Sequence, residues 1–234
     1  LWPNLNWTPT GPELISNNEM SSLDVEFMMR IKQFPHTSLL CLWFLAGSWA
    51  MPASTSGQVG WDTARVWTDF DAALQRPERV LRLDLTRSKW KEVDHRLRRF
   101  QHLRELVLDK NKIDTLPPWL GELNTLERLS LQSNQIRTIP PSLLALSSLR
   151  ELNLADNEIE GIPEDIDLME SLERLILWSN LVGHFPPSLS RLERLSELDL
   201  LHNEMSVDEQ TWVREILPNA KLHFSEPCQC RFDD

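Results

Sequence analysis

The residues that most often carry catalysis form no recognisable pattern in this chain. The six histidines are scattered, Gly totals only 7, and no Gly-rich loop of the kind that binds phosphate is present. Asp and Glu are abundant, but in an acidic chain most carboxylates are solvated surface groups. The sequence therefore predicts a protein that is not an enzyme and that needs no cofactor.

Cysteine is the residue type whose spacing comes nearest to a chemical motif. Cys228 and Cys230 flank a single residue near the C-terminus, and three cysteines in total are too few for a disulfide framework. The pair has three interpretations: free thiols, a strained disulfide between Cys228 and Cys230, or half of a metal site. No pair of histidines lies near enough to complete a metal site, so metal binding is the least favoured. Export would favour a disulfide, either local or to another chain.

Charged residues alternate at steps of 23. One position reads Arg82, Glu105, Arg128, Glu151, Arg174 and Glu197, and the position before it reads Leu81, Arg104, Glu127, Arg150, Glu173 and Ser196. On neighbouring parallel strands about 4.8 Å apart, each Arg would lie beside a Glu. This predicts a ladder of ion pairs that contribute roughly 0.2–1 kcal/mol each. The alternative is a groove for a charged ligand, but alternating signs nearly cancel the long-range field, so the ladder is preferred.

Large apolar side chains occupy strand positions that should face water. In LERLILWSN, residues 172–180, the leucines share one face of a strand, which puts Ile176 and Trp178 on the other face. Leu201 falls beside Trp178 one step of 23 later. This cluster indicates a surface that binds a partner. The predicted partner-binding residues are Trp178, Ile176, Leu201, Asp199, His202, Val107 and Asn153. The alternative is that Trp178 lies flat over its neighbours and binds nothing.

A repeat of 23 residues must position these side chains. Six units follow the pattern L-x-x-L-x-L-x-x-N-x-L, beginning at Val80, Leu103, Leu126, Leu149, Leu172 and Leu195. The alternation in x-L-x-L-x predicts a strand with its leucines inward, and the Leu-Pro or Ile-Pro segments predict short helical turns on the opposite, convex side. No unit can bury its leucines alone, so the units must stack. The asparagines are predicted to bond to the backbone where each strand ends.

This pattern resembles the leucine-rich repeat family, in its 23-residue form known from Ras-group and bacterial secreted repeat proteins. The second halves of the units support the resemblance, which covers residues 80–217: LPPWLGELNTL, IPPSLLALSSL, IPEDIDLMESL and FPPSLSRLERL. The resemblance implies an α/β solenoid, a horseshoe with a parallel concave β-sheet, short helical or 3-10 convex segments and helical caps. It also implies a general binding module, because this fold serves mainly for recognition.

Both ends of the repeat array carry apolar segments that could cover the core. Residues 62–79 are predicted to form a helical cap, with a capping-box start at Thr68 and Asp71 and a stop at Pro77. After the last strand of the array, Ser206 and Glu209 predict a second capped helix. Residues 218–234 are predicted to add one more strand, KLHF, and a tail.

The first sixty residues read as a targeting segment and a linker. Residues 29–50 carry two basic residues, a nine-residue apolar run, and small residues at Ser48 and Ala50, which is the order of a secretory signal peptide. The apolar run is too short to span a bilayer, which takes about 20 residues. Residues 1–28 are then an upstream extension ahead of a start at Met29, and residues 51–61 are a linker. The alternative is a buried helix in an N-terminal extension of a cytoplasmic protein.

Composition limits the classes of partner. The chain has 234 residues, is 41% hydrophobic and has a formal net charge of −11, which disfavours nucleic acid and anionic membrane surfaces. We expect a secreted or periplasmic monomer that binds a protein or peptide on its concave face and does not insert into a membrane. The alternative is a structural scaffold that acts through its convex face or its CxC tail.

Overall fold

The computed structural model describes residues 61–227, which belong to a compact unit, Ser54–Asp234. The upstream extension, the predicted signal peptide, and both Cys228 and Cys230 lie outside the described residues. Within residues 61–227, no helix is both long enough and apolar enough to cross a membrane.

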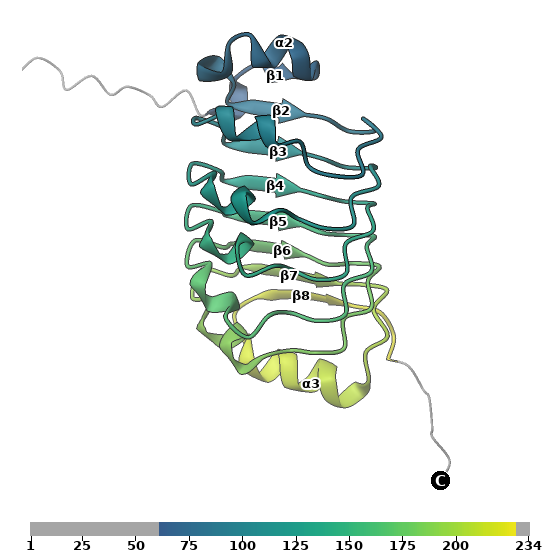
Figure 1. The fold of residues 1–234 in the computed structure, drawn as a ribbon. Helices are drawn as coiled ribbons and strands as arrows, with labels where there is room; N and C mark the ends of the chain where they lie inside the picture. Colours follow the sequence, from purple (N-terminus) through teal and green to yellow (C-terminus); the bar gives the residue numbers. More distant parts are fainter. Residues whose placement is uncertain (1–60, 228–234) are drawn as a thin grey trace, which may run out of the picture. The chain divides into compact units, whose positions relative to one another are not determined.

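Eight parallel strands form one sheet in chain order (Figure 1). They are β1 Val66–Trp67, β2 Arg82–Asp84, β3 Glu105–Val107, β4 Arg128–Ser130, β5 Glu151–Asn153, β6 Arg174–Ile176, β7 Glu197–Leu200 and β8 Lys221–Phe224. From β2 to β7 the register pairs residues 23 apart, as in Leu106 with Leu129. The predicted solenoid and its parallel sheet are confirmed. The sequence did not predict β1, because this strand precedes the first repeat.

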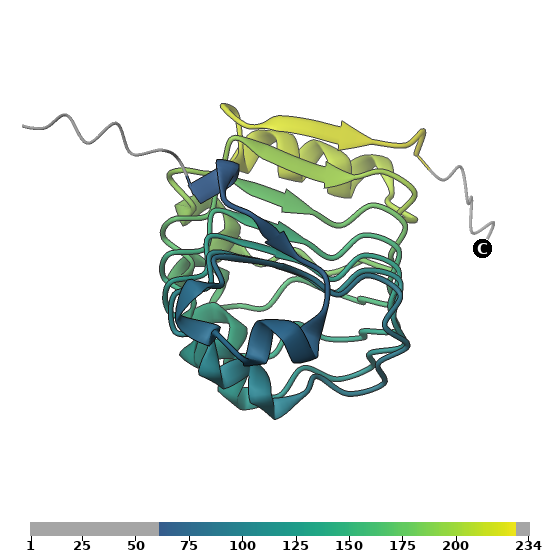
Figure 2. The same ribbon diagram turned by 90° about the horizontal axis from the view of Figure 1, so that it is seen from above.

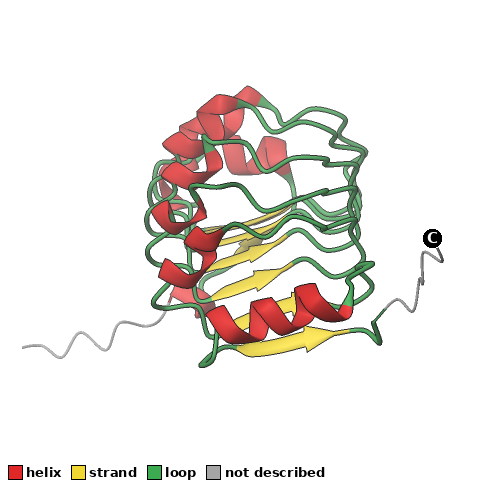
Figure 3. Cartoon of the chain, turned by 90° about the horizontal axis from the view of Figure 1, so that it is seen from below, coloured by secondary structure: helices red, strands yellow, loops and turns green. Residues whose placement is uncertain are grey.

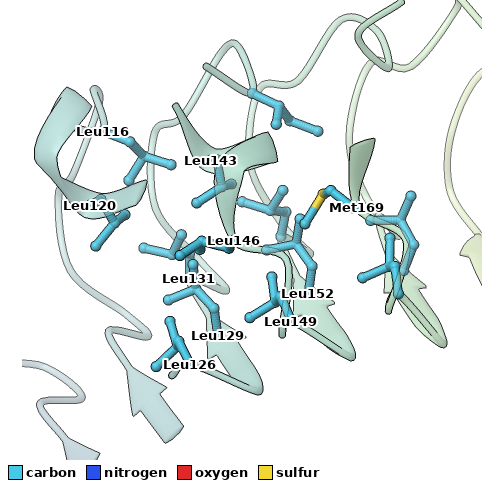
Figure 4. Packing of buried hydrophobic residues seen from close by; sticks show 14 of the residues in the cluster. Leu116, Leu120, Leu126, Leu129, Leu131, Leu143, Leu146, Leu149, Leu152 and Met169 are labelled. Carbon is cyan, nitrogen blue, oxygen red and sulfur yellow. The ribbon is translucent and has the colours of Figure 1, made fainter. Parts of the chain in front are cut away.

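The inward leucines of the repeat form one continuous core. In the second apolar position no side chain is more than 1% exposed, from Leu83 through Leu106, Leu129, Leu152 and Leu175 to Leu198. Figure 4 shows strand residues such as Leu129 and Leu131 on one side of this core and Leu120 and Leu143 on the other. Burying one Leu contributes about 1.5–3 kcal/mol before conformational entropy is subtracted.

Short 3-10 helices line the convex side, away from the strands (Figure 3). After η2 Trp61–Thr63 and η3 Pro77–Arg79, they are η4 His95–Arg99, η5 Pro118–Glu122, η6 Leu143–Ala145, η7 Ile166–Leu168 and η8 Pro187–Arg191. Prolines stand at the start of η3, η5 and η8, and Pro141 and Pro163 lie two and three residues before η6 and η7. Proline has no backbone N–H, so these helices cannot extend further toward the N-terminus. The predicted convex turns are therefore confirmed.

An asparagine closes the strand end of each repeat from the second onward. Asn180 is typical: its Oδ1 accepts a bond from the Ile159 N–H at 2.9 Å, and its Nδ2 donates to the carbonyls of Leu154 and Leu177, each at 3.0 Å. The same bonds recur at Asn111, Asn134, Asn157 and Asn203. Each asparagine thus joins two repeats and satisfies buried backbone groups, as predicted.

A short helix, α2 Phe70–Leu74, follows β1 and precedes the first repeat. Its N-cap is Asp69, whose side chain accepts a bond from the Ala72 N–H, so the predicted start at Thr68 was wrong by one residue. The Phe70 ring packs edge-on against the Trp90 ring, with 5.1 Å between centroids. This contact joins the cap to the first repeat.

The helix α3 Val207–Ile216 covers the other end of the core, and β8 extends the sheet beyond it (Figure 3). Ser206 and Glu209 make both bonds of the predicted capping box. Val213 is fully buried in the core, and Trp212 and Ile216 pack against it half-buried. The predicted C-terminal helix and the strand KLHF are both present.

Candidate binding site on the concave face

The concave face, defined as the outer surface of the sheet, carries the alternating charges in register. Strand pairing places Arg82, Glu105, Arg128, Glu151, Arg174 and Glu197 side by side along the sheet. Arg82 pairs with Glu105, and Glu151 forms ion pairs with both Arg174 and Arg128, the latter at 3.5 Å. At the end of the row, Glu197 binds His223 at 2.9 Å and Lys221 at 3.4 Å.

The neighbouring row pairs in the same way. Arg104 contacts Glu127, and Arg150 lies 3.8 Å from Glu127 and 3.3 Å from Glu173. Side chains in the two rows range from 16% to 55% exposed, so each pair contributes only about 0.2–1 kcal/mol. The predicted ladder of ion pairs is present, and its main effect is to separate like charges across closely spaced strands.

The predicted apolar cluster lies at the C-terminal part of the concave face. Ile176 ends β6, and Trp178 and Leu201 follow β6 and β7 in equivalent positions of adjacent repeats. The Ser179 N–H donates to the Leu201 carbonyl at 2.7 Å, which holds these two segments side by side. All three side chains are half-buried. Asp199 is paired with Ile176 in the sheet register, and the exposed His202 follows Leu201. The structure therefore brings these five predicted residues together.

Trp178 has a small neighbour on the preceding strand. Ala155 occupies the equivalent position one repeat earlier and is fully buried, although this position lies on the concave side and Ala155 is not part of the main core cluster. The Ala155 side chain is a single methyl group, which the larger side chains of Gln132 and Trp178 on either side can readily cover. Trp178 itself is half-buried, so only part of its side chain is exposed to solvent.

The other predicted residues have more local positions. Val107 is on β3, three strands from Ile176, so it does not belong to the apolar cluster. Asn153 and Asp199 each accept a bond from the backbone N–H two residues later, at 3.0 Å, and so stabilise the turns after β5 and β7. The backbone N–H of His202 donates to the Ser225 hydroxyl at 2.6 Å.

A segment that precedes the repeats also lies on the concave face, which the sequence did not predict. Trp61, the last residue of the expected linker, begins η2 and donates from its indole N–H to Glu127 at 2.9 Å. The Arg128 guanidinium lies over the Trp61 ring, 4.7 Å from its centroid, and contacts Asp62 at 3.0 Å. Figure 2 shows this segment on the strand side of the solenoid. No repeat-based signal marks it.

Two cavities adjoin aromatic residues. One, of about 440 Å³, lies on the concave face and is lined by Trp61, Asp62, Glu127, Arg128, Arg150, Glu151, Glu173, Arg174 and Ser196. The other, of about 560 Å³, lies off the sheet beside the segments that follow β2 and β3, between the half-buried Trp90 and Trp119. Among residues 61–227, no three metal-ligating side chains gather in a way that could hold an ion.

Solved structures with similar folds are repeat proteins. A leucine-rich repeat protein of Leptospira interrogans is 27% identical with a TM-score of 0.57, over 68% of this chain and 46% of that one. The ectodomain of the Arabidopsis thaliana receptor kinase GASSHO1/SCHENGEN3, in complex with Casparian strip integrity factor 2, is 22% identical with a TM-score of 0.50, over 63% of this chain and 22% of that one. The plant peptide hormone receptor RGFR1, in complex with RGF2, is 25% identical with a TM-score of 0.50, over 61% and 24%.

This chain therefore spans less than half the length of each of these structures. No curated protein matches the chain. A family model described as "Leucine-rich repeat region" matches residues 76–221, which include β2 to β7 and all six repeats. On that match and on its repeating geometry, the chain belongs to the leucine-rich repeat family.

Proposed function

We propose that this protein is a non-enzymatic module that binds a protein or peptide on its concave face. The observation that carries the proposal is the cluster of Ile176, Trp178 and Leu201, three large apolar side chains that converge on a surface made mainly of charged and polar groups. Trp is among the residue types that supply most of the binding energy of protein interfaces. The RGFR1 structure lends support, because that receptor is in complex with a peptide hormone, RGF2.

Capture experiments with matched variants test this proposal. The full chain is immobilised as wild type, as Ile176→Ser with Trp178→Ser, and as Leu168→Ser with Leu181→Ser. The second double variant is the control, because Leu168 and Leu181 are 58% and 57% exposed and are not among the concave-face residues. We expect specifically retained proteins, identified by mass spectrometry and then re-bound as purified proteins, to be lost only from the first variant.

Thermal unfolding separates the two interpretations of Trp178. Capture lost at an unchanged melting temperature supports the binding site. If capture persists in the Ile176→Ser, Trp178→Ser chain, the concave cluster is not the site. If the melting temperature falls together with capture, Trp178 serves chiefly to cover Ala155 and its other neighbours.

A scaffold that acts off the sheet is the second candidate. The cavity between Trp90 and Trp119 favours it, because two half-buried indoles beside an open cavity also suit a partner. In the same capture assay, Trp119→Ser would then abolish retention of the partner, whereas Ile176→Ser with Trp178→Ser would not. The other form of this candidate uses Cys228 and Cys230, and a mass measurement under non-reducing conditions would show whether they link the chain to a partner.

We propose further that the module acts outside the cytoplasm, after export directed by residues 29–50. The support is the order of basic, apolar and small residues in that segment. N-terminal sequencing of the natural protein should find a start near Met51. A mature chain that retains residues 29–50 would contradict export.

A further inference from the structure

Trp61 and Asp62 are held on the concave face by one Glu–Arg pair, which consists of Arg128 on β4 and Glu127 just before it. The Trp61 indole N–H donates to Glu127 at 2.9 Å, and the guanidinium of Arg128 lies over the indole ring while contacting Asp62 at 3.0 Å. The Asp62 carbonyl also accepts a bond from Arg82 on β2. A carboxylate acceptor next to a guanidinium thus recognises an aromatic N–H donor followed by an acid.

The same Glu–Arg pair recurs on β6. The sign of the charge alternates along both rows, so the same two-residue pair returns every second repeat. Glu173–Arg174 therefore occupies the position that Glu127–Arg128 occupies two strands earlier. The register confirms the equivalence, because Arg128 is paired with Glu151, and Glu151 with Arg174. On β2 the position before Arg82 is Leu81, which has no carboxylate, so β4 and β6 are the two strands of the array with the complete pair.

The two pairs differ in their exposure. The Glu127 side chain is 16% exposed, whereas that of Glu173 is 43% exposed. The Arg174 side chain is 46% exposed, against 37% for Arg128. Glu173 and Arg174 also line the concave-face cavity of about 440 Å³ that lies next to Trp61. The β6 pair therefore has both the chemistry of the β4 pair and room beside it for another segment.

We propose that Glu173 and Arg174 bind the partner of this protein through an aromatic residue with an N–H donor followed by an acidic residue, as Glu127 and Arg128 bind Trp61 and Asp62. The ligand is thus a peptide segment of Trp-Asp type that lies in the cavity beside Trp61. This inference rests on the proposed function and specifies the chemistry of its partner. Arg150, which is 55% exposed and 3.3 Å from Glu173, supplies a second cation at the cavity for a further acid of the ligand.

The chain itself supplies the probe. A dye-labelled peptide of residues 58–65, QVGWDTAR, is titrated with the full wild-type chain, and fluorescence anisotropy reports binding. We expect dissociation constants near the millimolar range, because exposed cation–π and ionic contacts are weak individually. Replacing Trp by Ala or Asp by Asn in the peptide should weaken binding about tenfold, which corresponds to about 1.4 kcal/mol.

Matched variants of the chain locate the site. Arg174→Ala removes one exposed Arg and its pair with Glu151, and should weaken peptide binding about tenfold. Arg191→Ala is the control, because it also removes an exposed Arg and one ion pair, with Asp167, but on the convex side. It should bind like wild type. No binding up to about 5 mM, binding unaffected by Arg174→Ala, or equal binding of the altered peptides would each overturn the proposal.

The outcomes also separate this proposal from the function on which it rests. If the peptide fails to bind while capture still depends on Ile176 and Trp178, the concave face binds a partner of other chemistry. If the peptide binds at Arg174 while capture is indifferent to Ile176 and Trp178, the apolar cluster is not the binding surface, but the Glu–Arg site stands. Because the altered peptides are tested on the unmodified chain, misfolding of a variant cannot produce the expected result.

Discussion

Asp109 shows how one residue can work against the stability of the face it helps to organise. Its carboxyl accepts bonds from the Ser130 hydroxyl at 2.6 Å and from the Gln132 N–H at 2.9 Å, on the next strand. Burial nevertheless raises the pKa of Asp109 above its ordinary value of 3.8, and these hydrogen bonds only partly oppose the rise. The donors bonded to it are neutral, and the nearby charges of Asp84 and Lys110 act in opposite directions on its pKa, so the effect of burial prevails.

The sign of this shift gives a pH-dependent prediction. Because the pKa of Asp109 is raised in the folded protein, the folded protein binds this proton more tightly than the unfolded chain does. The stabilisation that results is fully present below pH 3.8 and is lost as the pH rises through the folded pKa. Asp109→Asn keeps the acceptor oxygen and removes the charge, so it should raise the melting temperature at pH 7 more than at about pH 3.5. The exposed Asp165→Asn is the control, and equal shifts at both pH values would contradict the argument.

At the scale of elements, the turn after each repeat strand has a residue with positive φ, and the first repeat has two. Arg87, Lys110, Ser133, Asp156, Ser179 and His202 all have φ between 54° and 60°, and Lys89 has φ of 62°. None is a glycine, although a side chain costs roughly 1–2 kcal/mol in this conformation. The backbone there is fixed by bonds between turns, such as that from the Lys110 N–H to the Gln132 carbonyl at 2.8 Å, so the strain is held by stacking.

Two lysines in the same turn make a matched test of this strain. Lys110→Gly should raise the free energy of unfolding by about 0.5–1 kcal/mol, because Gly adopts positive φ without a steric penalty. Lys112→Gly should lower it by a similar amount, about 0.5–1 kcal/mol, since Lys112 is also exposed but is not in the left-handed region and only gains entropy in the unfolded state. Urea unfolding measures both, and changes of the same sign would refute the assignment of strain.

At the scale of the whole solenoid, each repeat depends on its neighbours and the ends depend on their caps. Every strand from β2 to β7 pairs with the strands just before and after it, and the convex turns stack in the same order. Stability of such an array is approximately a sum of repeat and interface contributions. The helix α3 covers the last interface, and Val213 is fully buried there. A substitution that disrupts α3 should therefore cause unfolding to begin at the C-terminal end.

A pair of substitutions in α3 tests this end-dependence. Val213→Asp places an unpaired charge in the core and should cost about 3 kcal/mol or more. Val207→Asp, at a site that is 59% exposed, adds an acid to the first turn of the same helix and should change stability by no more than about 0.5 kcal/mol. In Val213→Asp, hydrogen exchange should lose protection first at β7 and β8 while β3 and β4 keep theirs. Uniform loss along the chain would instead indicate a single cooperative unit.

The sequence by itself determined most of the features that repeat. Leucines at alternate strand positions, prolines in four of the returns and asparagines at five of the strand ends are local rules that a period of 23 repeats. The repeat strands, convex turns, asparagine bonds and charge rows are therefore as predicted. Ile176 and Trp178 stood out for the same reason, because they departed from a rule that the other units follow.

Only the tertiary structure decided the features that have no second copy. The strand β1 and the contacts of Trp61 and Asp62 are formed by the segment before the repeats, which lies against the sheet. The contact between Trp61 and Glu127 joins residues 66 positions apart and therefore leaves no periodic signal in the sequence. The coverage of Ala155 and the raised pKa of Asp109 likewise depend on the depth at which neighbouring strands bury a side chain. Periodicity gives the direction of a side chain, whereas burial and long-range contacts require the positions of all the segments around it.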